Sequence, residues 1–322
     1  MRRRSRPLWW KLGFSILTLL VALGILVTSW SATVNSHPAY LVTLLVVVVG
    51  AAVVAASCFF VRRGARPRDS QPPRLRRRVL YGVEILGVLA LLAFLLYTRP
   101  LTASSVAIDS MAGTAEVSVT DSATRIELQP TGAARTTGLI FYPGAKVDPR
   151  AYVPNLTPLA AAGYPVTILK LPYNIAFFSP KGAYRVMDDH RQITRWAVGG
   201  HSLGGVVASK VAGGDDPRVR GLLLWASYPN SSIADRTQLQ VTSISGSKDA
   251  LATPAKIDAA KSKLPPDTRY VVIDGGIHSF FGDYGLQSGD GTPSITRDEA
   301  QAQIRAASLD LLRRVEDASP EG

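Results

Sequence analysis

The sequence contains a single cysteine, Cys58, among its 322 residues. One thiol cannot form an intramolecular disulfide, and it cannot supply a metal site built from several cysteine ligands. Histidine is also scarce, with four residues in the whole chain, so few side chains can act as a base near neutral pH. These shortages exclude a disulfide-stabilised scaffold and a multi-cysteine metal site.

Acidic residues are almost absent from the first hundred positions. Residues 1–100 hold 14 Lys and Arg against two Asp and Glu, whereas residues 101–322 hold 22 of each. The whole net charge of +12 therefore belongs to the N-terminal segment. Because the remainder has no basic patch with interleaved aromatic residues, we predict no nucleic-acid partner.

Three long apolar runs fill that basic N-terminal segment, at about residues 12–30, 39–61 and 79–97. Each is long enough to cross a hydrocarbon layer of roughly 30 Å at about 1.5 Å per residue. Glu84 is the one charged residue within them. It is a candidate functional residue by its position in a span, and an interhelical partner or snorkelling to the surface would also account for it. We therefore predict a membrane segment over residues 1–98, with membrane lipid as a partner.

The distribution of arginine and lysine predicts how this segment is oriented. Five of these residues precede the first span, none lies in the loop 31–38, and eight arginines lie in the loop 62–78. Loops that carry Arg and Lys stay in the cytoplasm. The expected localisation is a multi-pass protein of the cell membrane with a cytoplasmic N-terminus and everything after residue 97 on the outer face.

Beyond the membrane segment we expect a tether at 99–114, one domain at 115–316 and a tail at 317–322. Apolar strand patterns alternate with helix patterns through the domain. This alternation is typical of an α/β fold with a mostly parallel sheet covered by helices on both faces. In such sheets the chemistry gathers beyond the carboxyl ends of the strands. The expected strands are 115–120, 125–128, 137–142, 165–171, 195–199, 221–226, 241–245 and 270–274.

The pattern Gly200-His-Ser-Leu-Gly204 lies between the strand 195–199 and an expected helix that starts at Leu203. A strand that turns directly into a helix forces its middle residue into a strained backbone conformation. The residues two positions away must then lack a Cβ, and the serine hydroxyl stands clear of the sheet. Ser202 is therefore the candidate nucleophile, although a glycine-rich turn without chemistry has the same pattern.

A serine nucleophile needs a base. His278 follows the last expected strand closely enough to reach across the sheet edge, whereas His37 lies in the loop between the first two spans. His190 precedes the strand before the serine, and His201, as the neighbour of Ser202, is expected to point elsewhere. By elimination His278 is the candidate base, and a surface histidine without a role is the alternative.

The base needs an acid that orients it. Asp249 directly follows the strand 241–245 and is the favoured candidate, with a turn or helix-capping aspartate as its alternative. Asp274 is the reserve. Tetrahedral intermediates also need an oxyanion hole. The expected donors are the backbone N–H of Leu203 and that of Ala145, with Gly144 as the alternative to Ala145.

Aromatic residues near this edge are candidates for an acyl pocket, although core packing explains them equally well. They are Tyr173, Phe177, Phe178, Phe280 and Phe281. Asp188-Asp189-His190 has metal-binding residue types, but three consecutive residues cannot all face one ion from a helix. We predict no metal and no cofactor.

The order Ser202, Asp249, His278, together with the elbow and the loop 142–145, resembles the alpha/beta-hydrolase superfamily, and within it the compact dienelactone-hydrolase-like branch. The resemblance covers residues 115–316 and implies hydrolysis through an acyl-enzyme. Two departures limit it. No long insertion follows the strand that ends at Ala226, where many relatives carry a lid, and the dienelactone enzymes use cysteine where this chain has Ser202.

The sequence thus predicts a membrane-anchored serine hydrolase, an enzyme that cleaves a carboxylic ester, with a small-molecule or lipid-like ester as its substrate. Two alternatives stay open. One is an acyltransferase of the same fold that uses an envelope acceptor, and the other is a non-catalytic domain that binds a ligand or scaffolds partners.

Overall fold

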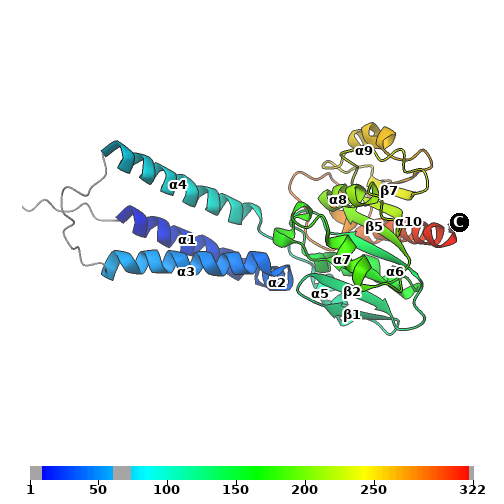
Figure 1. Cartoon of the computed structure of the whole chain (residues 1–322), viewed down its shortest axis with the longest axis horizontal. Coiled ribbons are helices and arrows are strands. Elements are labelled where there is room, and N and C mark those ends of the chain that lie inside the picture. Colours follow the sequence, from blue (N-terminus) through cyan, green and yellow to red (C-terminus); the bar gives the residue numbers. More distant parts are fainter. Residues whose placement is uncertain (1–8, 61–73, 319–322) are drawn as a thin grey trace, which may run out of the picture. The chain divides into compact units, whose positions relative to one another are not determined.

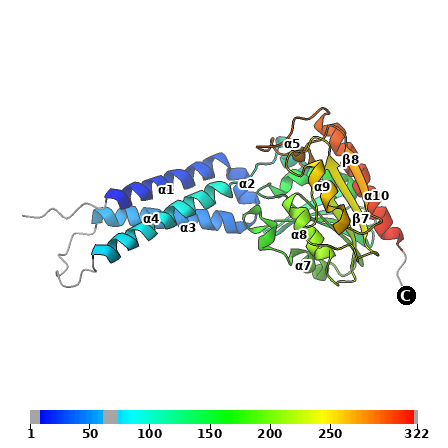
Figure 2. The same ribbon diagram turned by 90° about the horizontal axis from the view of Figure 1, so that it is seen from above.

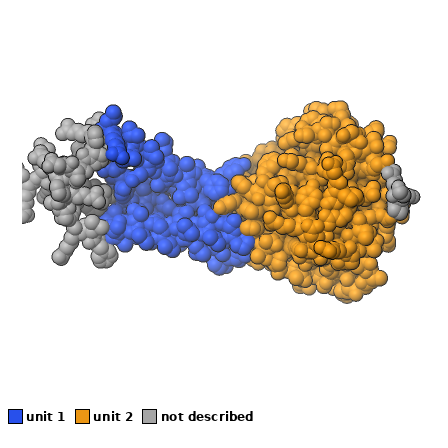
Figure 3. Space-filling model, in the orientation of Figure 1, with its two compact units in different colours: residues 1–34, 38–99 blue, residues 35–37, 100–322 orange. Residues whose placement is uncertain are grey.

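The computed structural model describes residues 9–60 and 74–318. It divides into two compact units, residues 1–34 with 38–99 and residues 35–37 with 100–322, which Figure 3 colours separately. The arginines before residue 9, those between residues 62 and 73, and the last four residues of the predicted tail lie outside the described residues.

The first unit is helical. Its elements are α1 (Trp9–Thr28), α2 (Trp30–Asn35), α3 (Pro38–Phe60) and α4 (Arg74–Tyr97). Three stretches of them are long and apolar enough to cross a membrane, namely Trp10–Thr28, Pro38–Cys58 and Val79–Tyr97. A helix that is apolar all round suits a lipid environment, because its backbone groups are satisfied internally and its side chains need no water.

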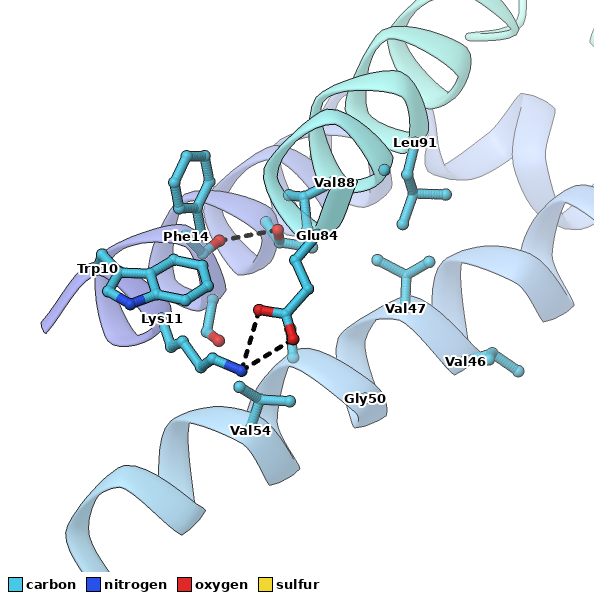
Figure 4. Close-up of a pocket in the computed structure, with 14 residues that line it drawn as sticks. Trp10, Lys11, Phe14, Val46, Val47, Gly50, Val54, Glu84, Val88 and Leu91 are labelled. Carbon is cyan, nitrogen blue, oxygen red and sulfur yellow. Dashed lines mark hydrogen bonds and ion pairs between the residues drawn. The ribbon is translucent and has the colours of Figure 1, made fainter. Parts of the chain in front are cut away.

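Glu84 has a partner on another helix of this unit. The Lys11 ammonium group on α1 lies 3.1 Å from the Glu84 carboxylate on α4. The pair borders a groove of about 550 Å³ that is lined by α1, α3 and α4, and Figure 4 shows the two side chains meeting there. An ion pair lowers the free-energy cost of placing a carboxylate among apolar helices. A partner on a neighbouring helix, which was one of the interpretations of Glu84, therefore accounts for its position.

The second unit is built on one eight-stranded sheet in the order β1-β2-β4-β3-β5-β6-β7-β8. β1 and β2 form the predicted antiparallel hairpin, and β2 also pairs antiparallel with β4. All other neighbours are parallel. The strands are β1 (Val117–Asp121), β2 (Arg125–Pro130), β3 (Thr137–Tyr142), β4 (Val166–Leu169), β5 (Arg195–His201), β6 (Val219–Trp225), β7 (Gln240–Gly246) and β8 (Arg269–Ile273).

Helices cover both faces of this sheet, which confirms the predicted fold class (Figure 1). The helices of this unit are α5 (Ser105–Asp109), α6 (Val153–Ala161), α7 (Gly182–Asp189), α8 (Leu203–Ala212), α9 (Pro254–Ala260) and α10 (Arg297–Asp317). Figure 2 shows α10 on one side of β7 and β8, and α7 with α8 on the other.

The residues of β3 alternate between two hydrophobic cores, because successive side chains of a strand point to opposite faces. Leu139 and Phe141 pack into the core that contains the buried residues of α6 and α10. Ile140 and Tyr142 pack into the core that contains those of α7 and α8. The central strands are therefore buried on both faces, and only their ends can present side chains to a substrate.

The segment 99–114, predicted to be a tether, is instead packed from Pro100 onward as part of the second unit. Leu101 N–H donates to the Lys146 carbonyl at 2.7 Å, and Ser104 N–H donates to the Asp283 carbonyl at 2.8 Å. Ala107 of α5 is fully buried in the core. Ala103 and Ala107 are buried, so part of the run of small residues that is typical of a linker in the sequence is packed here.

We predict that Thr296→Ala destabilises this unit without changing its chemistry. Thr296 and Glu299 form a complete capping box at the start of α10. Loss of this cap should lower the free energy of unfolding by about 1 kcal/mol and the Tm by about 2–4 °C. Thermal unfolding followed by tryptophan fluorescence measures this. An unchanged Tm would mean that the cap adds nothing to stability.

Candidate active site

Ser202 occupies a strained turn between β5 and α8. Its backbone angles are φ 52° and ψ −123°, outside the regions that residues with a Cβ ordinarily adopt. Four hydrogen bonds hold the residue there. Its N–H donates to the Trp225 carbonyl at 2.9 Å. Its carbonyl accepts from the Ser227 hydroxyl at 2.7 Å and from the N–H groups of Gly205 and Val206 at 3.0 and 3.4 Å. The neighbouring strand and helix therefore fix the position from which the hydroxyl projects.

The glycines on either side of Ser202 are required by close backbone approach. A Cβ on Gly200 would lie 2.4 Å from the carbonyl carbon of Gly204, and a Cβ on Gly204 would lie 2.0 Å from the Tyr142 carbonyl oxygen. The expectation that the residues two positions from the serine must lack a Cβ is confirmed. The pattern at 200–204 is a steric requirement of this turn.

The carboxyl ends of β7 and β8 bring Asp249 and His278 together. The Nδ1 atom of His278 lies 2.8 Å from Oδ2 of Asp249, and both side chains are buried. Since a carboxylate can only accept, the imidazole donates its Nδ1–H and leaves Nε2 as the basic nitrogen. Nε2 is buried and has no hydrogen-bond partner among the described residues.

Asp249 is fixed by its own turn as well as by the histidine. Its Oδ1 atom accepts from Leu251 N–H at 2.8 Å and from Ala252 N–H at 2.7 Å. Asp274, the reserve candidate, is exposed and accepts instead from the Ser247 hydroxyl at 2.9 Å. The geometry therefore pairs Asp249, and not Asp274, with His278.

The loop that carries His278 is held by Asp290, which sequence reasoning missed. The Asp290 carboxylate accepts from His278 N–H at 3.1 Å, from Ser279 N–H at 2.8 Å and from the Ser279 hydroxyl at 2.6 Å. No local sequence pattern predicts this role, because Asp290 lies in a polar, glycine-containing stretch that is typical of an ordinary turn.

The expected oxyanion donors, Leu203 and Ala145, differ from the alternative Gly144 in whether their N–H groups are already hydrogen-bonded. Gly144 N–H donates to the Tyr152 hydroxyl at 2.9 Å and is occupied. Neither Ala145 N–H, in the turn after β3, nor Leu203 N–H, at the first position of α8, donates a hydrogen bond within the described ranges. Both N–H groups are available to a ligand, whereas that of Gly144 is not.

The part of the chain that carries the candidate site matches a known protein family. A sequence model described as "Alpha/beta hydrolase family" matches residues 138–303, about half of the chain, including β3 and the whole of the candidate site. The chain belongs to the alpha/beta hydrolase family. The resemblance noted from Ser202, Asp249 and His278 is thereby confirmed at the level of the family. Comparison with curated proteins gave no match.

Among solved structures, the hydrolase is similar to a thermophilic esterase from the Planctomycetes species Thermogutta terrifontis with bound propionate (16% identity, TM-score 0.44, covering 66% of this chain and 98% of that one). It is also similar to an alpha-beta serine hydrolase homologue from Coxiella burnetii (17% identity, TM-score 0.42, covering 63% of this chain and 98% of that one). A third similar structure is a dienelactone hydrolase-like promiscuous phosphotriesterase from metagenomic libraries (15% identity, TM-score 0.43, covering 59% of this chain and 92% of that one).

The aromatic residues expected around an acyl pocket of the hydrolase fall into two groups. Phe280 and Phe281 are buried in the core, so core packing accounts for them. Phe177 and Phe178 are more than half exposed, and Tyr173 packs edge-on against Phe178 with ring centroids 5.7 Å apart. The two groups do not form one cluster of exposed rings.

The run Asp188-Asp189-His190 is explained by ion pairs on the surface of the hydrolase. Asp188 pairs with Arg218 at 2.9 Å and Asp189 pairs with Arg125. His190 contacts Glu127 at 2.7 Å. The three side chains thus reach three different partners.

His201 lies closer to the base than expected. Its ring centroid is 4.5 Å from that of His278, and its Nδ1 atom is 2.9 Å from the Tyr152 hydroxyl. The ring is fully buried. Burial, and second the charge that His278 can carry, hold the pKa of His201 well below 6.5. His201 is therefore neutral, and its contact with Tyr152 is a feature that the sequence did not indicate.

This buried histidine should make the hydrolase sensitive to acid. Because the pKa of His201 is lower in the folded than in the unfolded state, the unfolded chain binds the extra proton first as pH falls below about 6.5. The stability linked to His201 is complete above that pH and is lost below it, by at most about 1.4 kcal/mol per pH unit. Urea unfolding of wild type and His201→Asn between pH 7 and 5 should give a steeper decline for wild type. Parallel curves would contradict the prediction.

Proposed function

We propose that the protein is a membrane-anchored serine hydrolase that cleaves a carboxylic ester through an acyl-enzyme. The observation that carries the proposal is the buried Asp249–His278 hydrogen bond at the same sheet edge as the strained Ser202 turn. A nucleophile, a base and an orienting acid in this chain order are the components that acyl transfer requires. No cofactor is needed for this chemistry.

In the proposed first half-reaction, the Ser202 hydroxyl attacks the ester carbonyl carbon and its proton passes to Nε2 of His278. The buried Asp249 carboxylate stabilises the imidazolium that forms. Negative charge develops on the carbonyl oxygen, and the N–H groups of Leu203 and Ala145 are the donors proposed to bind it. When the carbon–oxygen bond of the ester breaks, the leaving alcohol takes the proton from His278.

In the second half-reaction, His278 removes a proton from water, and the resulting hydroxide attacks the acyl carbonyl. The same N–H groups bind the second oxyanion. Collapse of this intermediate expels Ser202, which regains the proton from His278, and releases the carboxylic acid. Each proton returns to its starting position, so the enzyme is regenerated without an external acid or base.

The substrate class we favour is a lipid-like or otherwise apolar ester. Three candidate membrane spans supply the anchor in this proposal. Phe177 and Phe178 add exposed aromatic surface in the loop after β4. These features suit a substrate that partitions into lipid. We also propose that the hydrolase unit lies outside the cytoplasm, because Arg and Lys are concentrated before the first span and in the loop 62–78.

We predict that a fluorophosphonate probe labels the wild-type protein and that Ser202→Ala abolishes both labelling and ester turnover. The probe reacts only with an activated serine, because it needs the base and the oxyanion donors as the substrate does. Ser209→Ala is the matched control, since Ser209 lies on the same helix and its hydroxyl bonds the Val206 carbonyl of that helix. This control should retain labelling.

Labelling is to be compared in intact and lysed cells, and turnover on a short soluble ester and on a long-chain ester in vesicles. Labelling of intact cells supports the outward topology, whereas labelling only after lysis contradicts it and leaves the chemistry intact. Retained turnover in Ser202→Ala, or a folded wild-type protein that is not labelled, would refute the proposed function. Preference for the soluble ester would count against a lipid-like substrate.

A further inference from the structure

The Tyr152 hydroxyl lies between two parts of the site that the proposed mechanism uses separately. Tyr152 ends the short helix η3 (Pro149–Tyr152) and is fully buried. Its oxygen accepts the N–H of Gly144 at 2.9 Å, and it lies 2.9 Å from Nδ1 of His201. One hydroxyl thus joins the loop after β3 to the residue that precedes Ser202.

The direction of these two hydrogen bonds follows from the chemistry of the groups. A backbone N–H can only donate, so the Tyr152 oxygen accepts from Gly144 and its single proton is free for His201. We assign this proton to the contact with Nδ1 of His201, because it has no other acceptor among the described residues, and the ring proton of His201 is then on Nε2. Burial raises the pKa of Tyr152 well above 10 and lowers that of His201, so both groups stay neutral over the working range of an esterase.

On one side, this arrangement fixes the peptide groups that flank Gly144. Tyr152 holds the Gly144 N–H, and the Gly144 carbonyl accepts from Val147 N–H at 3.1 Å. In a planar trans peptide the N–H points opposite to the C=O. The bond from Val147 therefore directs the N–H of Ala145 the other way, and the bond from Tyr152 keeps the preceding peptide from rotating. Ala145 is the proposed oxyanion donor.

On the other side, the same hydroxyl fixes the ring against which the base packs. The His201 ring stacks on Phe281, with centroids 5.8 Å apart and planes 9° apart. It also lies 4.5 Å from the His278 ring. The space is filled, since a Cβ on Gly144 would lie 2.7 Å from Nδ1 of His201 and 3.0 Å from the Tyr152 oxygen. A rotated His201 ring would have to displace one of these neighbours.

We propose that Tyr152 is a positioning residue for acyl transfer, whose hydroxyl couples the Ala145 loop to the His201 ring so that the oxyanion donor and His278 keep one fixed geometry. The inference rests on the proposed function. Tyr152 is fully buried, and its hydroxyl contacts Gly144 and His201. It acts through Gly144 on one side and through His201 on the other.

We expect Tyr152→Phe to lower kcat roughly 10- to 100-fold on a short soluble ester and to leave KM within about threefold. Complete removal of an oxyanion donor costs about 10²–10³ in kcat, and a displaced donor should cost less. The affinity for a trifluoromethyl ketone, whose adduct with Ser202 places an oxyanion in the same position, should fall by the same factor as kcat/KM. A loss that is only structural would lower the amount of active enzyme and leave this affinity unchanged.

Tyr164→Phe is the matched control. Tyr164 is equally buried in the same core, but its hydroxyl bonds Glu316 at 2.8 Å. It should keep wild-type kcat and ketone affinity. If Tyr152→Phe does not fold, a second pair tests the same bond: His201→Asn keeps an acceptor near the position of Nδ1, and His201→Leu does not. His201→Asn should retain at least tenfold more of the wild-type kcat than His201→Leu.

Fluorophosphonate titration of active sites distinguishes a failure of the proposed function from a failure of the proposed role of Tyr152. If Ser202 of the wild type is not labelled, the proposed function is refuted, and the role of Tyr152 with it. If the wild type is labelled normally, then equal kcat in Tyr152→Phe and Tyr164→Phe, or equal kcat in the two His201 variants, refutes the positioning role alone. An unchanged ketone affinity in a Tyr152→Phe variant with low kcat also refutes it.

Discussion

The steric constraint at the turn between β5 and α8 governs the rest of the site. A Cβ on Gly200 or Gly204 would lie 2.4 or 2.0 Å from backbone atoms, so only glycine fits at these two positions of the turn. The side chain of Ser202 is then the one that projects from the turn. Strain at a single residue of this kind costs of order 1–3 kcal/mol and persists only where the surrounding structure holds it. The hydrogen bonds from Ser227 and to Trp225 supply that hold.

The parallel sheet brings distant residues to the same edge. Asp249 and His278 follow β7 and β8, and their side chains meet because the carboxyl ends of parallel strands point the same way. Residues of β7 pack into both hydrophobic cores, Ile244 into one and Val241 into the other, and Ile273 of β8 packs into the first. Loops mounted on such a platform can hold reactive groups at fixed distances, which loops on a flexible support cannot do.

Much of this arrangement could be predicted from the sequence, because it follows from local rules. Alternation of apolar strands and helices predicts the sheet, and the order Ser202, Asp249, His278 predicts which strand ends meet. Contacts between residues far apart in the chain left no such signal. The bond from Tyr152 to His201 spans 49 positions, and the pair of Lys11 with Glu84 spans 73. The tether predicted at 99–114 was wrong for a related reason. A run of small residues is typical of a flexible linker, but Ala103 and Ala107 of this segment are buried.

The loop after His278 is closed on itself by the Asp290 carboxylate and by the bond from Gln287 N–H to the Ser279 hydroxyl. Within this loop, a Cβ placed on Gly285 would have no other atom within 4 Å, and the Leu286 side chain is 71% exposed. Extra residues inserted at 285–286 would lengthen a loop whose ends are already fastened, at an entropic cost that grows only slowly with length. The molecule therefore offers a place where a lid could be acquired without moving His278, the proposed base.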